Sequence, residues 1–202
     1  MPKIIDHEAR RADLVQAAWR VIERVGLEGA TIRAIAGEAG ASTAIVTHYF
    51  ADKREILRAV LSTSQARIEE RRRAAVSRHA GIEALEVALL DSLPLDEERR
   101  LELLIEVSFW ARAIADPESA AEHLKSHDAW RRALVRLLKD CVARGEVPPC
   151  NVNEEADMLV ALIDGLGVDA LMHPDRLSSA RQVRLVRAAL RRVGRDTPDD
   201  AT

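Results

Sequence analysis

The stretch from Thr31 to Ile56 limits the possible folds of this chain more than any other part of it. It reads TIRAIAGEAGASTAIVTHYFADKREI. Thr31 and Ser42 are each suited to cap the start of a helix, because a short hydroxyl side chain accepts a hydrogen bond from a free backbone N–H group. Gly40 stands before the second cap and takes positive φ without strain. The stretch therefore predicts two short helices separated by a tight turn.

The second of these helices is predicted to have one apolar side and one open side. Ile45, Val46 and Tyr49 recur at helical spacing and are expected to face the first short helix. Small or polar side chains remain on the open side, namely Thr43, Ala44, Thr47 and His48. A helix-turn-helix lays its second helix in the major groove of DNA, where bulky side chains would prevent close approach. The stretch therefore indicates a DNA-reading head, with Phe50 in its core.

Helix signals continue on both sides of this stretch. An amphipathic helix is predicted from about Glu8 to Val25, ending at Gly26, and Asp52 is expected to cap a long helix that reaches about Ser77. Later helices are predicted at residues 82–93, 96–115, 118–144, 153–173 and 178–193. Aromatic residues make up only 3% of the chain, and its abundant alanine, leucine, arginine and glutamate favour helix over strand.

We expect an all-α protein of about nine helices. Residues 1–51 would form a three-helix, helix-turn-helix DNA-binding head. Residues 52–195 would form a helical body for effector binding and dimerisation, and residues 196–202 a frayed tail.

Residues 10–57 resemble the TetR family of transcriptional regulators. The likeness is carried by the amphipathic first helix, by Thr31–Ala36, by Ala39–Ser42, by Tyr49 with Phe50, and by Lys53. Two positions depart from the family pattern, which often has glycine where Ala44 stands and tyrosine where Thr47 stands. The segment STAIVTHYF is similar to the subgroup of the choline-responsive repressor BetI, which also tends to lack that tyrosine.

This resemblance implies a ligand-responsive repressor that binds a palindromic operator as a dimer and is released by a small molecule. Together with the open side of the second helix, it assigns DNA contact to Thr31, Arg33, Ser42, Thr43, Ala44, Thr47, His48, Tyr49 and Lys53. Tyr49 and Lys53 enter this set as phosphate contacts through the resemblance alone. Thr31 and Ser42 would also serve as caps without DNA, and the others would then be ordinary surface side chains.

The charge of the head supports this interpretation less than the motif does. Residues 1–50 carry equal numbers of acidic and basic side chains, without the basic excess typical of DNA-binding domains. Phosphate contact depends on position, however, and one surface could be lined by Arg10, Arg11, Arg33, Lys53 and Arg54. The alternative is an interaction protein that keeps the TetR fold and has lost operator binding.

The last two predicted helices each carry an apolar stripe. The stripes consist of Leu159, Leu162, Ile163 and Leu166 on one helix and of Val183, Val186 and Leu190 on the other. Two such helices from each of two copies would make a four-helix seam in a two-fold dimer. The resemblance to a family that dimerises through its last two helices favours this prediction. The alternative is that both stripes close the core of a single chain.

The resemblance also implies a small-molecule effector among the helices of the body. Candidate lining residues are Phe109, Trp110, Trp130 and Met158, with His123, His127 and Asp128 as polar members; the alternative for each is ordinary packing. If the effector resembles choline, the indole faces of Trp110 and Trp130 would attract its quaternary ammonium. The run Arg71–Arg73 beside Glu69 and Glu70 predicts a solvated helix face rather than a site.

Patterns of catalysis, metal binding and membrane insertion are missing from the sequence. It has no glycine-rich phosphate loop, no GxSxG elbow and no HExxH, so we expect neither an enzyme nor a cofactor. Cys141 and Cys150 fit neither a disulfide framework nor a zinc site. The N-terminus is charged from Lys3 onward, and no stretch has the length and apolar character of a membrane span. We expect a cytoplasmic protein with DNA, a second copy of itself and a small molecule as partners.

Overall fold

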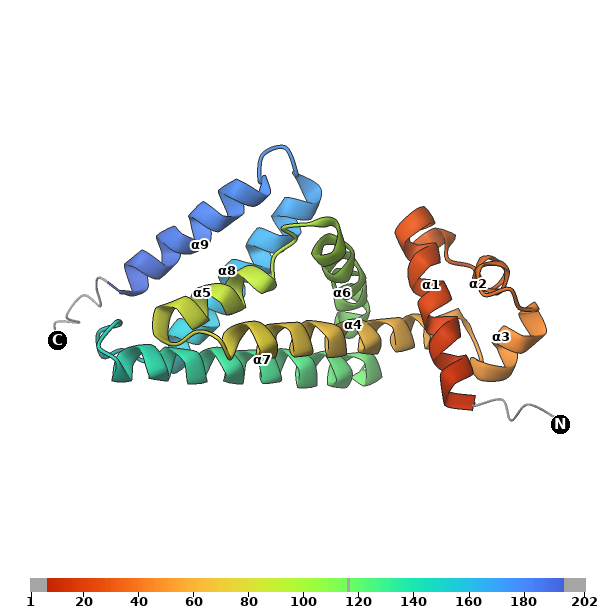
Figure 1. Ribbon diagram of the computed structural model, residues 1–202, viewed down its shortest axis with the longest axis horizontal. Coiled ribbons are helices and arrows are strands. Elements are labelled where there is room, and N and C mark those ends of the chain that lie inside the picture. Colours follow the sequence, from red (N-terminus) through yellow and green to blue (C-terminus); the bar gives the residue numbers. More distant parts are fainter. Residues whose placement is uncertain (1–6, 116, 195–202) are drawn as a thin grey trace. The chain divides into compact units, whose positions relative to one another are not determined.

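The computed structural model describes residues 7–115 and 117–194 and shows helices joined by short connections (Figure 1). The helices are α1 (His7–Gly29), α2 (Ile32–Glu38), α3 (Thr43–Tyr49), α4 (Lys53–Val76), α5 (Gly81–Asp91), α6 (Glu97–Ala115), α7 (Pro117–Ala143), α8 (Val152–Met172) and α9 (Ser179–Val193). The described residues contain no strand, and the predicted all-α fold of about nine helices is confirmed. The predicted frayed tail lies outside the described residues.

The chain divides into two compact units, residues 1–66 and residues 67–202. The division falls inside α4, so this helix contributes to both units. The boundary predicted after residue 51 falls just before α4 begins, whereas the observed division falls within α4.

The first unit, here called the head, packs α1, α2, α3 and the beginning of α4 around one apolar core. The core contains Leu14, Ala18, Val21 and Ile22 of α1, Ile35 of α2, Val46 of α3, Phe50, and Ile56 and Val60 of α4. Gly26 interrupts α1 with φ of 74°, a value that suits glycine, and a short further turn continues to Gly29. The predicted end of the first helix is therefore a break within α1.

The turn between α2 and α3 has the predicted caps. Thr31 Oγ1 accepts a hydrogen bond from the Ala34 N–H at 3.1 Å, and Ser42 Oγ accepts one from the Ile45 N–H at 3.3 Å. Gly40 between the helices has φ of 57°. Asp52 caps α4 as expected, because its Oδ1 accepts from the Glu55 N–H at 2.8 Å. These local interactions fix where each helix of the head begins.

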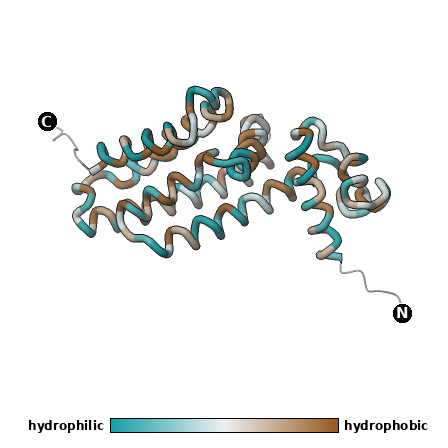
Figure 2. The backbone as a smooth tube through the Cα atoms, turned by 45° about the horizontal axis from the view of Figure 1, so that its top comes forward, coloured by the Kyte–Doolittle hydropathy of each residue, from teal (hydrophilic) through white to brown (hydrophobic). Residues whose placement is uncertain are grey.

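The second unit, here called the body, packs α5 to α9 with the end of α4. The helix α5 contacts both α7 and α9, and α7 also contacts α6 and α8. Figure 2 shows hydrophobic positions recurring along these helices between hydrophilic ones. The buried ones form a single core that includes Leu85, Leu89, Leu93, Leu134, Leu138, Cys141, Leu159, Val160, Ile163, Leu166, Val186 and Leu190. The body therefore closes a core without a second chain.

Five of the seven side chains predicted to form a dimer seam lie inside this core. They are Leu159, Ile163, Leu166, Val186 and Leu190. The prediction that these five face a second copy is wrong, because helical spacing shows that a stripe is buried but not which chain buries it. Val183 is half-buried, and Leu162 is 37% exposed. Only the outer edge of the predicted stripes remains available to a partner.

The first turn of α5 is held by two carboxylates from the end of α7 and the turn after it. The Gly81 N–H donates to Asp140 Oδ2 at 2.8 Å, and the Ile82 N–H donates to Glu146 Oε2 at 2.6 Å. These bonds satisfy N–H groups that have no partner within the helix. The hydrogen bond from Gly81, followed by that from Arg144, lowers the pKa of Asp140. Gly81 has φ of 55°, and a Cβ added to it would lie 2.0 Å from Glu146 Oε2.

Replacement of this glycine is expected to destabilise the body. Gly81→Ala should lower the free energy of unfolding by about 2 kcal/mol, because it adds strain at positive φ and displaces the Glu146 carboxylate. Denaturant unfolding followed by circular dichroism measures the change. The control is Gly37→Ala, where an added Cβ meets no atom within 4 Å, and stability should stay the same or rise by up to about 1 kcal/mol. Equal effects of the two substitutions would contradict this role of Gly81.

Candidate functional site

One side of α3 is free of packing within the head. Thr43, Ala44, Thr47 and His48 are all exposed, as predicted, and are here called the open face. Val46 is fully buried on the opposite side, and Tyr49 is half-buried. Ile45 is 38% exposed, so the head buries it only in part. The reason is that α3 is short and is held mainly through Val46 and the following Phe50.

Thr47 presents a defined set of groups on the open face. Its Oγ1 donates to the backbone oxygen of Thr43 at 3.1 Å and lies 3.2 Å from that of Ala44. Because the hydroxyl proton is used inside the helix, the side chain offers a methyl group and oxygen lone pairs outward. A methyl group suits contact with a thymine methyl, and a lone pair accepts from the amino groups of adenine or cytosine. Thr47 therefore has the chemistry of a base-reading side chain.

Three aromatic rings gather at the end of the open face. The ring centroid of His7, at the start of α1, lies 4.3 Å from that of Tyr49 and 6.0 Å from that of His48. The rings of His48 and Tyr49 meet edge to face at 5.3 Å. Sequence reasoning included His48 and Tyr49 but missed His7, because nothing near His7 in the sequence marks a contact with α3.

Most of the basic side chains expected on one surface of the head have other roles. Lys53 Nζ donates to the backbone oxygens of Leu27 at 2.9 Å and Glu28 at 3.2 Å, so it ties α4 to the end of α1. Lys53 thus has a structural role, and its contact with phosphate stays a prediction, because an ammonium has a third N–H group to donate. Three of the other basic side chains also have partners within the head. Arg10 lies 3.8 Å from Asp13, the guanidinium of Arg11 lies 4.8 Å from the centroid of the Phe50 ring, and Arg54 lies 3.6 Å from Asp52.

Arg33 remains exposed on α2 without an ion pair to any described residue, and its contact with DNA stays a prediction. Other charged side chains of the head form ion pairs between α1 and α2. Glu38 of α2 accepts from Arg20 Nε and Arg24 Nη1 of α1, each at 2.8 Å. The hydrogen bond from Arg20, followed by that from Arg24, lowers the pKa of Glu38. The even balance of charges in the head thus partly reflects pairing between helices.

The body holds a group of charged side chains, here called the interior charge cluster. Its members are Arg71 and Arg72 of α4, Asp91 of α5, Glu102 and Glu106 of α6, and Asp164 of α8. Arg71 joins three helices, with Nε on Asp91 Oδ1 at 2.7 Å and its two Nη atoms on the Glu102 carboxylate at 2.9 and 2.7 Å. These bonds, led by those to Glu102, raise the pKa of Arg71.

Negative charge is in excess within this cluster. Two guanidinium groups face four carboxyl groups, and His127 Nε2 lies 3.8 Å from Asp164 Oδ2 at its edge. Burial, followed by the nearby Asp164, raises the pKa of Glu106 to about 7, and Arg72 opposes this shift. Burial also raises the pKa of Asp164. Carboxylates removed from water need a proton or a cation, so the cluster is suited to receive positive charge.

The predicted effector-lining residues are only partly brought together. Phe109, Trp110 and Trp130 are half-buried side chains of α6 and α7. Trp130 adjoins the interior charge cluster, because the Arg72 guanidinium lies 4.0 Å from its ring centroid. Met158 is 59% exposed on α8, so its predicted place in an interior site is wrong: it lies on the opposite side of α8 from the buried stripe.

The polar candidates also separate. Asp128 is exposed, and His127 lies at the edge of the cluster. The side chain of His123 lies outside the described residues.

Sequence reasoning missed the carboxylates of the cluster and misplaced two arginines. Arg73 pairs with Glu69 and Glu70 on an exposed face, as predicted. Arg71 and Arg72 instead turn into the body, because consecutive helix residues point in different directions. A signal was present in the segment LELLIEVSFW, where Glu102 and Glu106 stand one turn apart among apolar residues.

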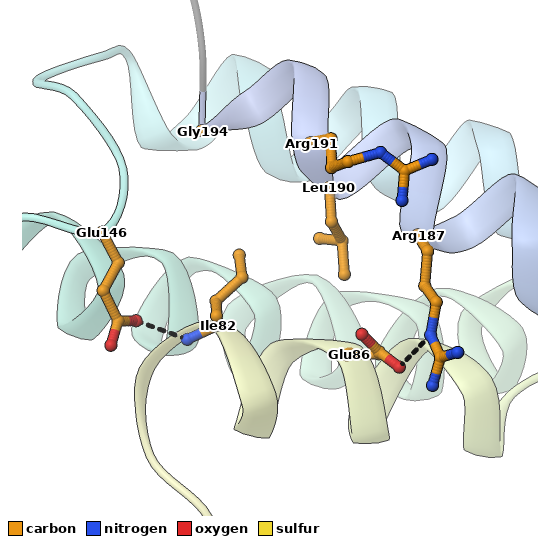
Figure 3. A pocket seen from close by; sticks show the side chains of 7 residues that line it. All are labelled: Ile82, Glu86, Glu146, Arg187, Leu190, Arg191 and Gly194. Atoms are coloured by element: carbon orange, nitrogen blue, oxygen red, sulfur yellow. Dashed lines mark hydrogen bonds and ion pairs between the residues drawn. The ribbon is translucent and has the colours of Figure 1, made fainter.

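A separate open pocket of about 370 Å³ lies between α5 and α9 (Figure 3). Two of its charged side chains have partners in its walls: Glu146 accepts from the Ile82 N–H at 2.6 Å, and Arg187 Nε donates to Glu86 at 2.8 Å. Leu190 points from α9 toward α5 and forms part of its lining. Arg191 also lines this pocket, which is open to solvent.

Two further classes of site are not found in the described part of the chain. No three His, Cys, Asp or Glu side chains of residues 7–115 and 117–194 are grouped so as to hold a metal ion. None of the helices in the same ranges combines the length and apolar character that crossing a bilayer requires.

Comparison with known protein families matches both units of the chain. Residues 14–60 match the family described as bacterial regulatory proteins, tetR family. Residues 81–195 match the family described as BetI-type transcriptional repressor, C-terminal.

Individual proteins are similar along nearly the whole chain. The HTH-type transcriptional regulator PksA of Bacillus subtilis (strain 168) is 34% identical over 192 residues, covering 92% of this chain and 90% of the relative. BetI of Escherichia coli (strain K12) is 31% identical over 190 residues, covering 93% of this chain and 95% of the relative. A putative transcriptional regulator from Saccharomonospora viridis, solved in complex with choline, has a TM-score of 0.84 at 26% identity, covering 91% of this chain and 96% of the other.

The raised pKa of Glu106 makes a prediction about stability and pH. The folded carboxyl has the higher pKa, so its stabilising contribution is complete below pH 4.5 and is lost as the pH rises through about 7. Glu106→Gln removes this dependence and should raise the free energy of unfolding at pH 8 by roughly 2 kcal/mol. Thermal unfolding at pH 5.5 and pH 8 measures both effects. Glu98→Gln, at an exposed position of the same helix, should keep the wild-type profile, and a wild-type profile in Glu106→Gln would refute the assignment.

Proposed function

Because this chain belongs to the TetR family of bacterial transcriptional regulators, which are not enzymes, we propose that it is a ligand-responsive repressor that binds a palindromic operator as a dimer. It has the DNA-binding and BetI-type C-terminal domains of that family. The observation that carries the proposal is the open face of α3, which follows a capped turn and is exposed at four successive outward positions. Occupancy of the operator by such a head blocks transcription without recruiting another protein.

DNA contact is proposed for a surface around the open face. Thr43 and Thr47 read base edges or thymine methyl groups, and Ala44 allows the helix to approach closely. Phosphate contacts come from hydroxyl, aromatic and basic side chains at the margin of this face: Thr31, Arg33, Ser42, His48, Tyr49 and, from the structure, His7. Lys53 is proposed to add a phosphate contact through its third N–H group, while its ammonium also holds backbone oxygens of α1.

A dimer is proposed through the outer face of α8 together with α9. Met158, Leu162 and Gly165 recur at helical spacing on the exposed side of α8, and Leu185 is exposed on α9 at 39%. Large exposed apolar side chains at such spacing are typical of a helix that packs on a partner. Two copies would set two heads on half-sites roughly 34 Å apart, which explains how a head with a small reading surface achieves specificity.

The proposed effector is an organic cation that binds at the interior charge cluster beside Trp130. The excess of two carboxylates over guanidinium groups favours positive charge, and an indole face favours a quaternary ammonium. The Saccharomonospora viridis regulator in complex with choline supports the same ligand class. An effector that binds one arrangement of the dimer more tightly shifts the population away from the operator-bound form. The protein would act in the cytoplasm, where its operator lies.

The even charge balance of the head favours one second candidate, an interaction protein with the TetR fold that no longer binds an operator. DNA binding distinguishes the two functions. The repressor binds the intergenic DNA beside its own gene as a dimer, and the interaction protein binds no DNA specifically.

A negative charge on the open face is expected to abolish operator binding. Thr47→Glu should weaken binding by about 100-fold or more, because a carboxylate at the base edges repels nearby phosphates and removes the threonine methyl contact. Electrophoretic mobility shift with the intergenic fragment measures the affinity. Ser62→Glu adds the same charge at an exposed position of α4 and should change it less than threefold. Equal loss in both variants would leave the open face without a special role.

A charge on the outer face of α8 is expected to prevent dimerisation. Leu162→Arg should weaken the dimer by about 100-fold and lower operator affinity with it, because a guanidinium is costly to bury in an apolar seam. Sedimentation equilibrium gives the molecular mass in solution. Leu104→Arg, at an exposed apolar position of α6 outside the proposed seam, should remain dimeric. A dimeric Leu162→Arg would place the seam elsewhere.

A further inference from the structure

One position beside the interior charge cluster is already filled by a cation of the chain itself. The guanidinium of Arg72, on α4, lies over the ring of Trp130, on α7, with Cζ 4.0 Å from the ring centroid. This is within the distance at which a cation is attracted by the negative face of an indole. The ring face over which Arg72 lies would suit an incoming organic cation and is therefore already occupied in the structure.

Arg72 is held far less firmly than its neighbour Arg71. Arg71 makes three hydrogen bonds of 2.7 to 2.9 Å to two carboxylates. Arg72 has one hydrogen bond, from Nη2 to Ser92 Oγ at 3.2 Å, and its nearest carboxylate oxygens belong to Glu69 at 3.9 Å and Asp91 at 4.0 Å. Its Nε is buried without a hydrogen-bond partner among the described residues.

The carboxylates around Arg72 do not offset the cost of burying its guanidinium. The side chain is only 14% exposed, and burial lowers the pKa of its guanidinium, although the group stays protonated. Asp91, Glu69 and Glu106 are the negative charges that act on it, and Arg71 is the nearby positive one. A buried cation with one hydrogen bond can leave its place at lower cost than one held by two carboxylates.

We propose that Arg72 is an internal competitor of the effector: its guanidinium occupies the Trp130 ring face that the cationic effector takes, so the two exclude each other. The inference rests on the proposed function, and in particular on a cationic effector at the interior charge cluster. When the effector replaces Arg72, one positive charge takes the place of another, so the exchange leaves the net charge of the cluster unchanged, and Arg72 moves to solvent. Because Arg72 belongs to α4, which begins in the head, this exchange couples the ligand to the helix shared by both units.

The first test measures cation affinity by isothermal titration of the full-length protein with choline and with tetramethylammonium, at constant ionic strength. Arg72→Gln should bind both at least tenfold more tightly than the wild type, because no internal cation needs to be displaced. Arg72→Met, which keeps an unbranched apolar stem for packing, should show the same gain if Arg72→Gln folds poorly. Arg72→Lys keeps a positive charge without the planar group that stacks on indole and should lie between.

The matched control is Arg73→Gln. It removes the same charge from the adjacent position, where the side chain is exposed and pairs with Glu69 and Glu70. Its cation affinity should stay within twofold of the wild type. An equal gain in Arg73→Gln and Arg72→Gln would mean that general electrostatics governs affinity, and the competition would be refuted.

The second test measures operator affinity with and without choline. The wild type should lose at least tenfold in operator affinity on adding choline, whereas Arg72→Gln should change less than twofold, because the contact between α4 and Trp130 is already absent. Unchanged or weaker cation binding by Arg72→Gln and Arg72→Met, or a full choline response of their operator affinity, would overturn the competition while leaving the cationic effector in place. If neither wild type nor variants bind either cation, the cationic effector itself is wrong, and the competition falls with it.

Discussion

The way in which α3 is held decides what the head presents to DNA. Val46 is fully buried and Phe50 anchors the chain directly after the helix, so α3 cannot rotate about its axis without exposing an apolar side chain. The Ser42 cap fixes where the helix begins. The orientation of α3 about its axis and the residue at which it begins together determine that Thr43 and Thr47 point outward. The head thus relies on a preorganised face of small side chains, since it has little excess positive charge to add affinity.

In the body, the balance of buried charges, rather than the shape of a surface, decides which ligand can bind. Arg71 compensates Asp91 and Glu102 through direct hydrogen bonds, which leaves Glu106 and Asp164 without a comparable partner. A pKa of about 7 means that Glu106 carries a proton much of the time near neutral pH. Proton and organic cation then become alternative ways to neutralise the same cluster. An apolar site would have no reason to prefer a charged ligand.

The sequence predicted those features that arise within a few residues of one another. The caps at Thr31, Ser42 and Asp52 and the turn at Gly40 depend on neighbouring backbone groups, and all four are found. Features that depend on distant segments were missed or misplaced. The periodicity of Leu159 and Val186 showed burial but not that their own chain buries them, and nothing near Lys53 in sequence marked the end of α1 as its partner. The interior charge cluster combines residues from four helices, so no local pattern could define it.

Arg71 and Arg72 show how one helix can be both fixed and movable. Consecutive residues on a helix point about 100° apart, which turns Arg71 toward carboxylates of α5 and α6 and Arg72 toward an aromatic ring of α7. The first contact keeps α4 attached to the body whether or not a ligand is present. The contact of Arg72 can be exchanged for the effector. Because α4 is hydrogen-bonded along its length, a displacement at one end of the helix is largely passed on to the other end. A ligand-responsive regulator needs both contacts. A helix held by fixed contacts alone does not respond to the ligand, and a helix without a fixed contact does not pass a defined movement to the rest of the protein.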